Sequence, residues 1–137
     1  MNPLARWVPR LIIATAVLHF VWALAQPNDW AGIVGDGFVR TAIDPNAPEY
    51  YPREASIWFM AAGIVILAMG TLSLHVVRTT GRLPAQVGWY LLATGVPMCA
   101  IYFPVTGSWA LVVIGVLALI AARRPAGPRG GEGALSR

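Results

Sequence analysis

Charged residues are scarce in this sequence, and lysine is missing altogether. Only 12% of the 137 residues are charged, whereas 57% are hydrophobic. Because a soluble domain averages about 25% charged residues, this chain has too little charge to cover a water-exposed surface. We therefore expect a lipid bilayer to surround most of the chain.

Cysteine is equally scarce, and patterns that specify a reaction are missing. The single thiol, Cys99, excludes an internal disulfide, and its apolar neighbours argue against a reactive thiolate. The sequence has no pattern typical of a catalytic serine, a phosphate cradle or a calcium loop. We therefore expect no catalytic residue, no metal site and no cofactor.

Four apolar segments dominate the chain, at residues 8–25, 55–77, 86–105 and 109–122. At about 1.5 Å per residue, the first covers close to the ~30 Å hydrocarbon thickness of a bilayer. Two segments carry glycines seven residues apart, where a neighbouring backbone can approach closely: Gly63 with Gly70, and Gly88 with Gly95. The pattern predicts an all-α, four-transmembrane-helix bundle over residues 1–124 and a disordered cytoplasmic tail over residues 125–137.

The first apolar segment has two interpretations. Basic residues, an apolar run and Ala23-Leu24-Ala25 before Gln26 also fit a cleavable signal peptide. However, polar and aromatic residues recur along the segment at spacings of four, three and four, which places them on one helical stripe: Thr15, His19, Trp22 and Gln26. A discarded peptide would not need such a stripe, so we favour retention and keep cleavage as the alternative.

The segment from Gln26 to Arg53 is polar and predicts an extracytoplasmic loop. Asn28 or Asp29 can cap a helix, and five residues that follow would share one face: Trp30, Ile33, Val34, Phe38 and Thr41. This pattern predicts a short amphipathic helix on the membrane surface, ended by the prolines of residues 44–48. The acidic residues would form a solvated loop: Asp29, Asp36, Asp44 and Glu49.

The arginines indicate the orientation of the chain. The net charge is +4, but the arginines stand at the ends of apolar segments and not on one face, which argues against nucleic-acid binding. Arg40 and Arg53 lie among acids in the long loop, and the other arginines belong to the termini and the middle turn: Arg6, Arg10, Arg78, Arg82, Arg123, Arg124, Arg129 and Arg137. The positive-inside rule then places both termini in the cytoplasm of a multi-pass protein of the inner (plasma) membrane.

Several short motifs give the chain a family resemblance. Together they resemble an uncharacterised domain-of-unknown-function family of small four-helix bacterial membrane proteins, common in actinobacteria and broadly DoxX-like in layout. The resemblance covers residues 4–122 and implies a fold and a membrane location, but no activity. The motifs are residues 53–59, 81–84, 88–89 and 104–109, with the mid-helix His19.

His19 is the polar residue that most needs an explanation, because ionisable groups at membrane depth are costly and mark function by default. At about 13 Å from Arg10, it would lie level with Thr94 and with the Ala93 carbonyl, which Pro97 leaves unbonded. One interpretation is therefore a neutral imidazole that bonds one of these groups and locks two helices together. The other is a ligand contact or proton transfer. His75 would lie about 8–9 Å closer to the inner boundary, too far to share a metal with His19.

The residues near the outer boundary form the candidate binding site. Glu54 and Arg53 are interpreted either as a charged gate over a cavity, or as a carboxylate favoured by the helix dipole beside an arginine at the headgroups. The aromatic residues are interpreted either as an interfacial belt or as the lining of an apolar pocket. The candidate ligand-binding residues are His19, Trp22, Gln26, Glu54, Trp58 and Tyr102.

The leading functional hypothesis is a non-enzymatic integral membrane protein that binds an apolar small molecule or a partner helix in its outer half. A homo-oligomer or another membrane protein would supply that helix. A membrane enzyme or redox accessory acting on a lipophilic substrate, with His19 as acid/base, is the second hypothesis. A small proton-coupled exporter is the third, although the sequence has no acidic residue inside an apolar segment.

Overall fold

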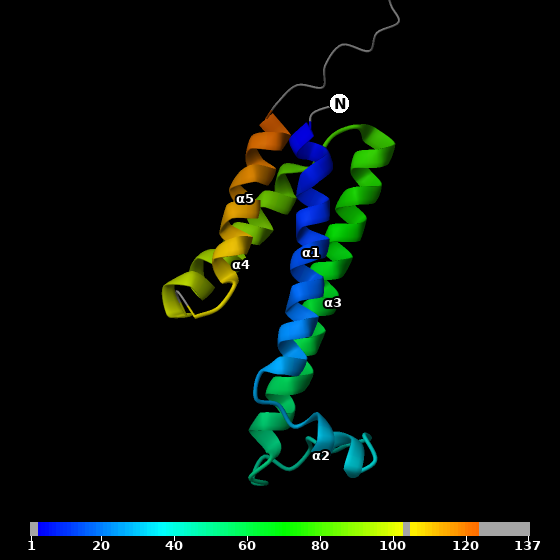
Figure 1. Cartoon of the computed structure of the whole chain (residues 1–137), viewed down its shortest axis with the longest axis vertical. Helices are drawn as coiled ribbons and strands as arrows, with labels where there is room; N and C mark the ends of the chain where they lie inside the picture. Colours follow the sequence, from blue (N-terminus) through cyan, green and yellow to red (C-terminus); the bar gives the residue numbers. More distant parts are fainter. Residues whose placement is uncertain (1–2, 103–104, 124–137) are drawn as a thin grey trace, which may run out of the picture. The chain divides into compact units, whose positions relative to one another are not determined.

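The protein is helical throughout its regular structure. The structure is a computed structural model that describes residues 3–102 and 105–123 (Figure 1). The helices are α1 (Pro3–Ala25), α2 (Trp30–Gly35), α3 (Tyr50–Thr80), α4 (Ala85–Tyr102) and α5 (Ser108–Arg123). The all-α fold class is therefore confirmed, while the predicted tail at residues 125–137 lies outside the described residues.

The chain divides into two compact units. Unit 1 comprises Met1–Ile12 and Met69–Arg137, and unit 2 comprises Ile13–Ala68. Helices α4 and α5 belong to unit 1 and α2 belongs to unit 2, whereas α1 and α3 contribute residues to both.

Two helices are long and apolar enough to cross a membrane. They are α1, with a mean hydropathy of 1.8, and α3, with 2.1. α3 has 31 residues, about 46 Å of helix, because polar residues at both ends continue the helix beyond the predicted segment 55–77. The predicted segments coincide with α1, α3, α4 and α5. That all four cross the bilayer stays a prediction.

In unit 1, glycines bring the backbones of α4 and α5 into contact, and the two helices lie side by side (Figure 1). A Cβ atom on Gly88 would lie 2.8 Å from the Gly115 carbonyl oxygen, and one on Gly115 would lie 3.1 Å from the Gly88 carbonyl oxygen. A Cβ atom on Gly95 would lie 2.9 Å from the Leu111 Cβ. Because only glycine leaves room for such contacts, the predicted close approach at Gly88 and Gly95 is confirmed.

In unit 2, α2 is shorter than predicted. The Phe38 N–H donates to the Ile33 carbonyl at 2.8 Å, and the Gly37 N–H donates to the Val34 carbonyl at 3.2 Å. With Gly37 at a φ of 87°, these bonds form a Schellman motif, which ends a helix where a glycine adopts the left-handed conformation. The prediction of one amphipathic helix reaching Thr41 is therefore wrong.

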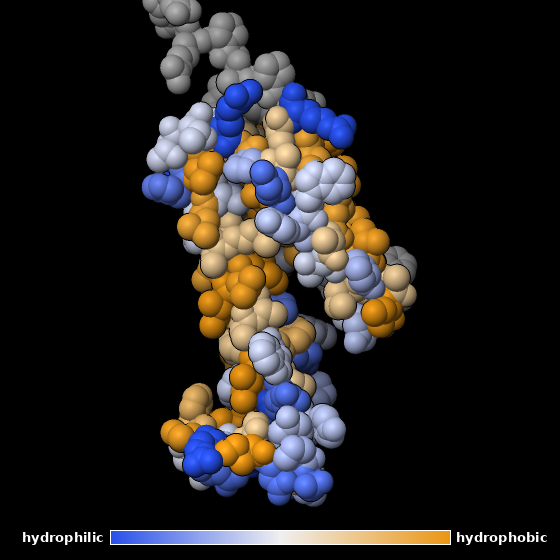
Figure 2. Space-filling model, turned by 180° about the vertical axis from the view of Figure 1, so that it is seen from behind, coloured by the Kyte–Doolittle hydropathy of each residue, from blue (hydrophilic) through white to orange (hydrophobic). Residues whose placement is uncertain are grey.

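The apolar residues of α2 and of the turn after it do not form one face with a common exposure, as the prediction assumed. Ile33 is buried, whereas Val34 and Phe38 are 65% and 63% exposed. Hydrophobic side chains likewise cover much of the visible surface of the helices, while strongly hydrophilic residues gather where helices end (Figure 2). Unit 2 thus presents apolar side chains outward from its helices and from its loop.

Candidate functional site

His19 joins α1 to α3 within unit 2. Its Nε2 lies 2.8 Å from the Phe59 carbonyl oxygen, and since a carbonyl only accepts, Nε2 carries the proton. The imidazole also stacks on the Phe59 ring, with centroids 4.1 Å apart and planes 8° apart. The predicted partner, Thr94 or the Ala93 carbonyl, is therefore corrected to the Phe59 carbonyl, although the expected role of tying two helices together holds.

Gly63 is the reason that His19 can reach a carbonyl inside a regular helix. A Cβ atom on Gly63 would lie 2.6 Å from Phe20 Cε1 and 3.0 Å from His19 Cδ2. Gly63 is thus closely approached, but by the side chains of α1 and not by its backbone as predicted. A regular-helix carbonyl already accepts an intrahelical bond, but its second lone pair can accept one more, and His19 uses it.

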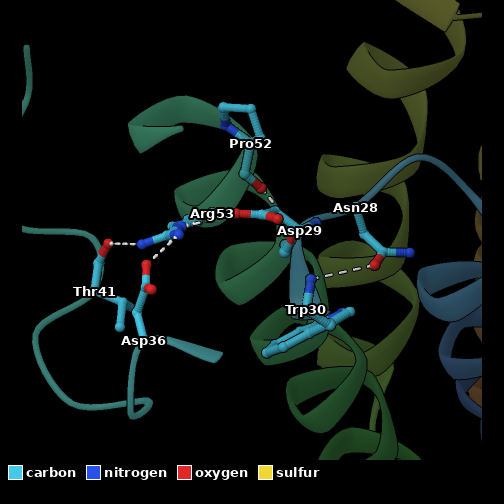
Figure 3. A network of polar contacts seen from close by, with 8 residues as sticks. Asn28, Asp29, Trp30, Asp36, Thr41, Pro52 and Arg53 are labelled. Atoms are coloured by element: carbon cyan, nitrogen blue, oxygen red, sulfur yellow. Dashed lines mark hydrogen bonds and ion pairs between the residues drawn. The ribbon is translucent and has the colours of Figure 1, made fainter. Parts of the chain in front are cut away.

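Arg53 is the centre of a polar network at the start of α3 (Figure 3). Its Nε donates to Asp29 Oδ2 at 2.7 Å and its Nη2 donates to Asp36 Oδ2 at 2.6 Å. Its Nη1 donates to the Thr41 carbonyl oxygen at 3.0 Å. The Arg53 side chain is only 12% exposed. We call this network, with Ser56, the Arg53 latch, because one guanidinium holds three points of the preceding loop.

Ser56 completes the Arg53 latch one helical turn further on. Its buried hydroxyl donates to the Pro52 carbonyl at 2.7 Å and accepts the Asp29 N–H at 3.1 Å. Asp29 is therefore held through both its side chain and its backbone. Asp29, one of the two predicted capping residues, occupies the N-cap position of α2 but makes no side-chain cap bond there, since Arg53 engages its carboxylate. The Trp30 N–H donates instead to Oδ1 of Asn28, the other candidate, at 3.3 Å.

These contacts correct one prediction about charge and add to another. The Arg53 guanidinium is bound by two carboxylates, whereas its place at the headgroups stays a prediction. Asp29 and Asp36 are not simply solvated. The pKa of Arg53 is raised, first by the hydrogen bond that its guanidinium donates to Asp29 and then by the one that it donates to Asp36. Sequence reasoning missed this network because it joins residues up to 27 positions apart.

Glu54 raises the pKa of the neighbouring Tyr50 side chain. The charge of the Glu54 carboxylate is the main cause that raises the pKa of Tyr50, followed by burial and by a hydrogen bond between the two side chains. Because α3 begins at Tyr50, Glu54 lies in the second turn, beyond the first turn in which the helix dipole acts most strongly. The expected dipole role of Glu54 is thereby weakened.

The six predicted ligand-binding residues differ in their setting. His19, Gln26 and Glu54 are half-buried, whereas Trp22 and Trp58 are 52% and 67% exposed. Tyr102 belongs to unit 1 and the other five to unit 2. Their role in ligand binding stays a prediction.

The described residues supply no cluster suited to a metal. In residues 3–102 and 105–123, no group of three His, Cys, Asp or Glu side chains could hold an ion. The polar side chains of unit 2 instead form ion pairs and hydrogen bonds that fix the backbone.

The fold and these contacts define a helical protein with two helices able to cross a membrane by length and composition. The chain belongs to a family of unknown function, DUF6463, whose model matches residues 3–125. This confirms the resemblance to an uncharacterised family; its bacterial distribution and DoxX-like layout stay expectations. No match was found among curated proteins or among solved structures.

Proposed function

We propose that this protein is a non-enzymatic integral protein of the plasma membrane that binds a partner transmembrane helix through unit 2. In this proposal α1, α3, α4 and α5 all cross the bilayer, and both termini are cytoplasmic. The apolar character of α1 and α3 supports the membrane location. The division of charge supports the orientation, because the described residues of unit 1 carry five arginines and no acid.

The contact between His19 and Phe59 supports retention of α1. Cleavage after Ala25 would remove the imidazole that fills the space at Gly63 and bonds the Phe59 carbonyl. It would leave an apolar face of α3 without a partner. A signal peptide has no reason to carry a side chain fitted to a later helix, so the helix pair is the functional form in this proposal.

One stripe of exposed residues on α3 carries the binding proposal. Tyr51, Trp58 and Val65 are 70%, 67% and 62% exposed, and the exposed Ala55 and Ala62 stand between them. The spacing of four, three, four and three places all five on one face of a helix. Small residues between large ones leave notches that accept the side chains of another helix, as membrane helix pairs require.

The competing hypotheses gain less from these contacts. An acid/base role for His19 would need an imidazole free to meet a substrate, whereas Nε2 already donates to the Phe59 carbonyl. The small-molecule hypothesis keeps the same exposed aromatic residues but gives Ala55 and Ala62 no role. Binding of a small molecule therefore remains the alternative outcome of the test below.

Photocrosslinking inside the membrane tests this proposal. A photoreactive phenylalanine replaces Ala62 on the stripe or, as the matched control, Ile64, which is 59% exposed on the same helix but about 200° away around its axis. We expect position 62 to capture one protein of discrete mass, position 64 to capture lipid, and A55L to abolish the product at position 62. Lipid at both positions would contradict a helix partner, and a reproducible small-molecule adduct would establish the alternative.

A further inference from the structure

A basic groove opens at the start of α1, in the part of this helix that belongs to unit 1. It has a volume of about 300 Å³ and is lined by Pro3, Arg6, Trp7 and Arg10. Neither the proposed helix partner nor the Arg53 latch involves these residues. The groove therefore requires an explanation of its own.

The two arginines of the groove are neighbours on the helix surface, and Arg10 lies over an aromatic ring. Arg6 and Arg10 are four residues apart, so that their side chains are neighbours on the helix surface. The Arg10 guanidinium carbon lies 5.5 Å from the centroid of the Trp7 ring, within the range of a cation–π contact. Trp7 is 58% exposed and both arginines are exposed, so the groove is open to a ligand.

The charges of the groove have no counterpart in the surrounding described residues. Two like charges at this spacing repel each other. The described part of unit 1 contains no Asp or Glu at all. An anion supplied from outside would relieve the repulsion, and two guanidinium groups provide the forked donors that match phosphate oxygens.

We propose that this groove binds the phosphate of an anionic phospholipid headgroup. The inference rests on the membrane location proposed above. Trp7 favours a lipid over free phosphate, because an indole ring prefers the boundary between headgroups and hydrocarbon. The uncharged apolar stretch of α1 begins immediately after Arg10, where acyl chains would start. Basic pockets at the cytoplasmic ends of membrane helices suit such headgroups.

Other arginines at this end of unit 1 provide the matched control. The start of α1, the turn between α3 and α4, and the end of α5 lie at the same end of the unit (Figure 1). Arg78 lies in the last turn of α3, Arg82 lies in the turn between α3 and α4, and both are exposed. Replacing them by glutamine removes the same charge from the same end of the unit, but leaves the groove unchanged.

The experiment counts lipids bound to the full chain by native mass spectrometry in detergent. Wild type, R6Q/R10Q, R6K/R10K and R78Q/R82Q are each titrated with phosphatidylglycerol, with zwitterionic phosphatidylcholine, and with phosphatidylglycerol in the presence of excess inorganic phosphate. We expect wild type to prefer phosphatidylglycerol, and R6Q/R10Q to lower that affinity about thirtyfold, at the usual strength of two interfacial arginines. R78Q/R82Q should change it less than about threefold, and R6K/R10K should retain part of it.

The outcomes separate the groove from the general basic surface. Equal losses in R6Q/R10Q and R78Q/R82Q, or no preference between the two lipids in wild type, would overturn the proposed site. Displacement by inorganic phosphate would replace the lipid with a free phosphate as the ligand. A purified chain that begins at Gln26 would remove the groove and refute the four-helix proposal as well, whereas an intact chain without lipid preference would refute the groove alone.

Discussion

Units 1 and 2 hold their helices together in different ways. In unit 1, α4 and α5 meet through Gly88 and Gly115, whose carbonyl oxygens lie against each other's Cα positions. In unit 2, side chains make the connections, through His19 on the Phe59 carbonyl and Arg53 on Asp29. Contact between backbones tolerates almost no added volume, whereas the side-chain network depends on particular charges and hydrogen bonds.

The two units also differ in the charged residues that they contain. The described residues of unit 1 have five arginines and no acid, whereas unit 2 has two arginines and five acids. Arg53 binds two of those acids, while the arginines of unit 1 lack an acidic residue among the described part of their own unit. Charge in unit 2 therefore connects segments of the backbone through Arg53, whereas the role of the unit 1 arginines in orientation stays a prediction.

The largest expected effect comes from adding volume to the glycine contact of unit 1. In Gly88→Val the new Cβ atom would meet a backbone oxygen that cannot rotate away. We expect the free energy of unfolding to fall by about 3 kcal/mol, measured by chemical or thermal unfolding in detergent. Gly107→Ala is the matched control, since nothing lies within 4 Å of its added Cβ, and it should change stability by less than about 0.5 kcal/mol. Equal effects would refute the backbone contact.

Removing the guanidinium of Arg53 should disrupt unit 2 and spare unit 1. Arg53→Gln loses two ion pairs and the bond to the Thr41 carbonyl. We expect amide hydrogen exchange in residues 26–49 to accelerate about tenfold or more, with no change in α4 and α5. The control is Arg40→Gln, an exposed arginine of the same loop. If both variants accelerate exchange equally, charge alone, and not the Arg53 latch, orders the loop.

Truncation of His19 should have a smaller effect on the same unit. His19→Ala removes one hydrogen bond and one stacked ring, and a helix–helix hydrogen bond in a membrane contributes about 1 kcal/mol. We expect a loss of unfolding free energy of about 1–2 kcal/mol, read from thermal unfolding in detergent. His75→Ala, an exposed histidine of unit 1, should have no measurable effect. A stable His19→Ala protein would remove the packing role assigned to the imidazole.

The smallest expected effect concerns the titration of Tyr50. The charge of Glu54 raises the Tyr50 pKa above its ordinary 10.0, because the phenolate would form beside a carboxylate. As pH rises past 10.0, the unfolded chain releases this proton before the folded one does, so the folded state loses stability in alkali. Glu54→Gln should bring the pKa back toward 10.0 and lessen that loss. Phenolate absorbance in a Tyr51→Phe, Tyr90→Phe, Tyr102→Phe background measures it, and an unchanged titration would contradict the assignment.

Hydropathy was sufficient to predict the four longer helices among the described residues, but not their ends. The four apolar segments coincide with α1, α3, α4 and α5. However, α3 begins at Tyr50 and not at Ala55, because polar residues continue a helix as readily as apolar ones. The end of α2 depended on one conformation, that of Gly37. The pattern of apolar residues through Thr41 could not reveal it.

The sequence predicted which types of residue form the candidate site, but not which residues they contact. A helical stripe with His19 in an apolar segment indicated a contact between helices, and that contact exists. Helical depth then suggested Thr94 or the Ala93 carbonyl, whereas the gap left by Gly63 decided in favour of Phe59. The ion pairs of Arg53 join distant segments, and no local spacing marks them. Composition indicates where charges lie, but only the fold decides which of them meet.

The central proposal is that the loop at residues 26–49 is extracytoplasmic and that the end of α3 is cytoplasmic. In a Cys99→Ser background, single cysteines replace Asn46 in the loop of unit 2 or Thr79 at the end of α3 in unit 1. A membrane-impermeant maleimide is applied to intact cells and to lysed cells. The account predicts that N46C reacts in intact cells and that T79C reacts only after lysis. Reaction of both cysteines in intact cells, or the reverse pattern, would contradict it.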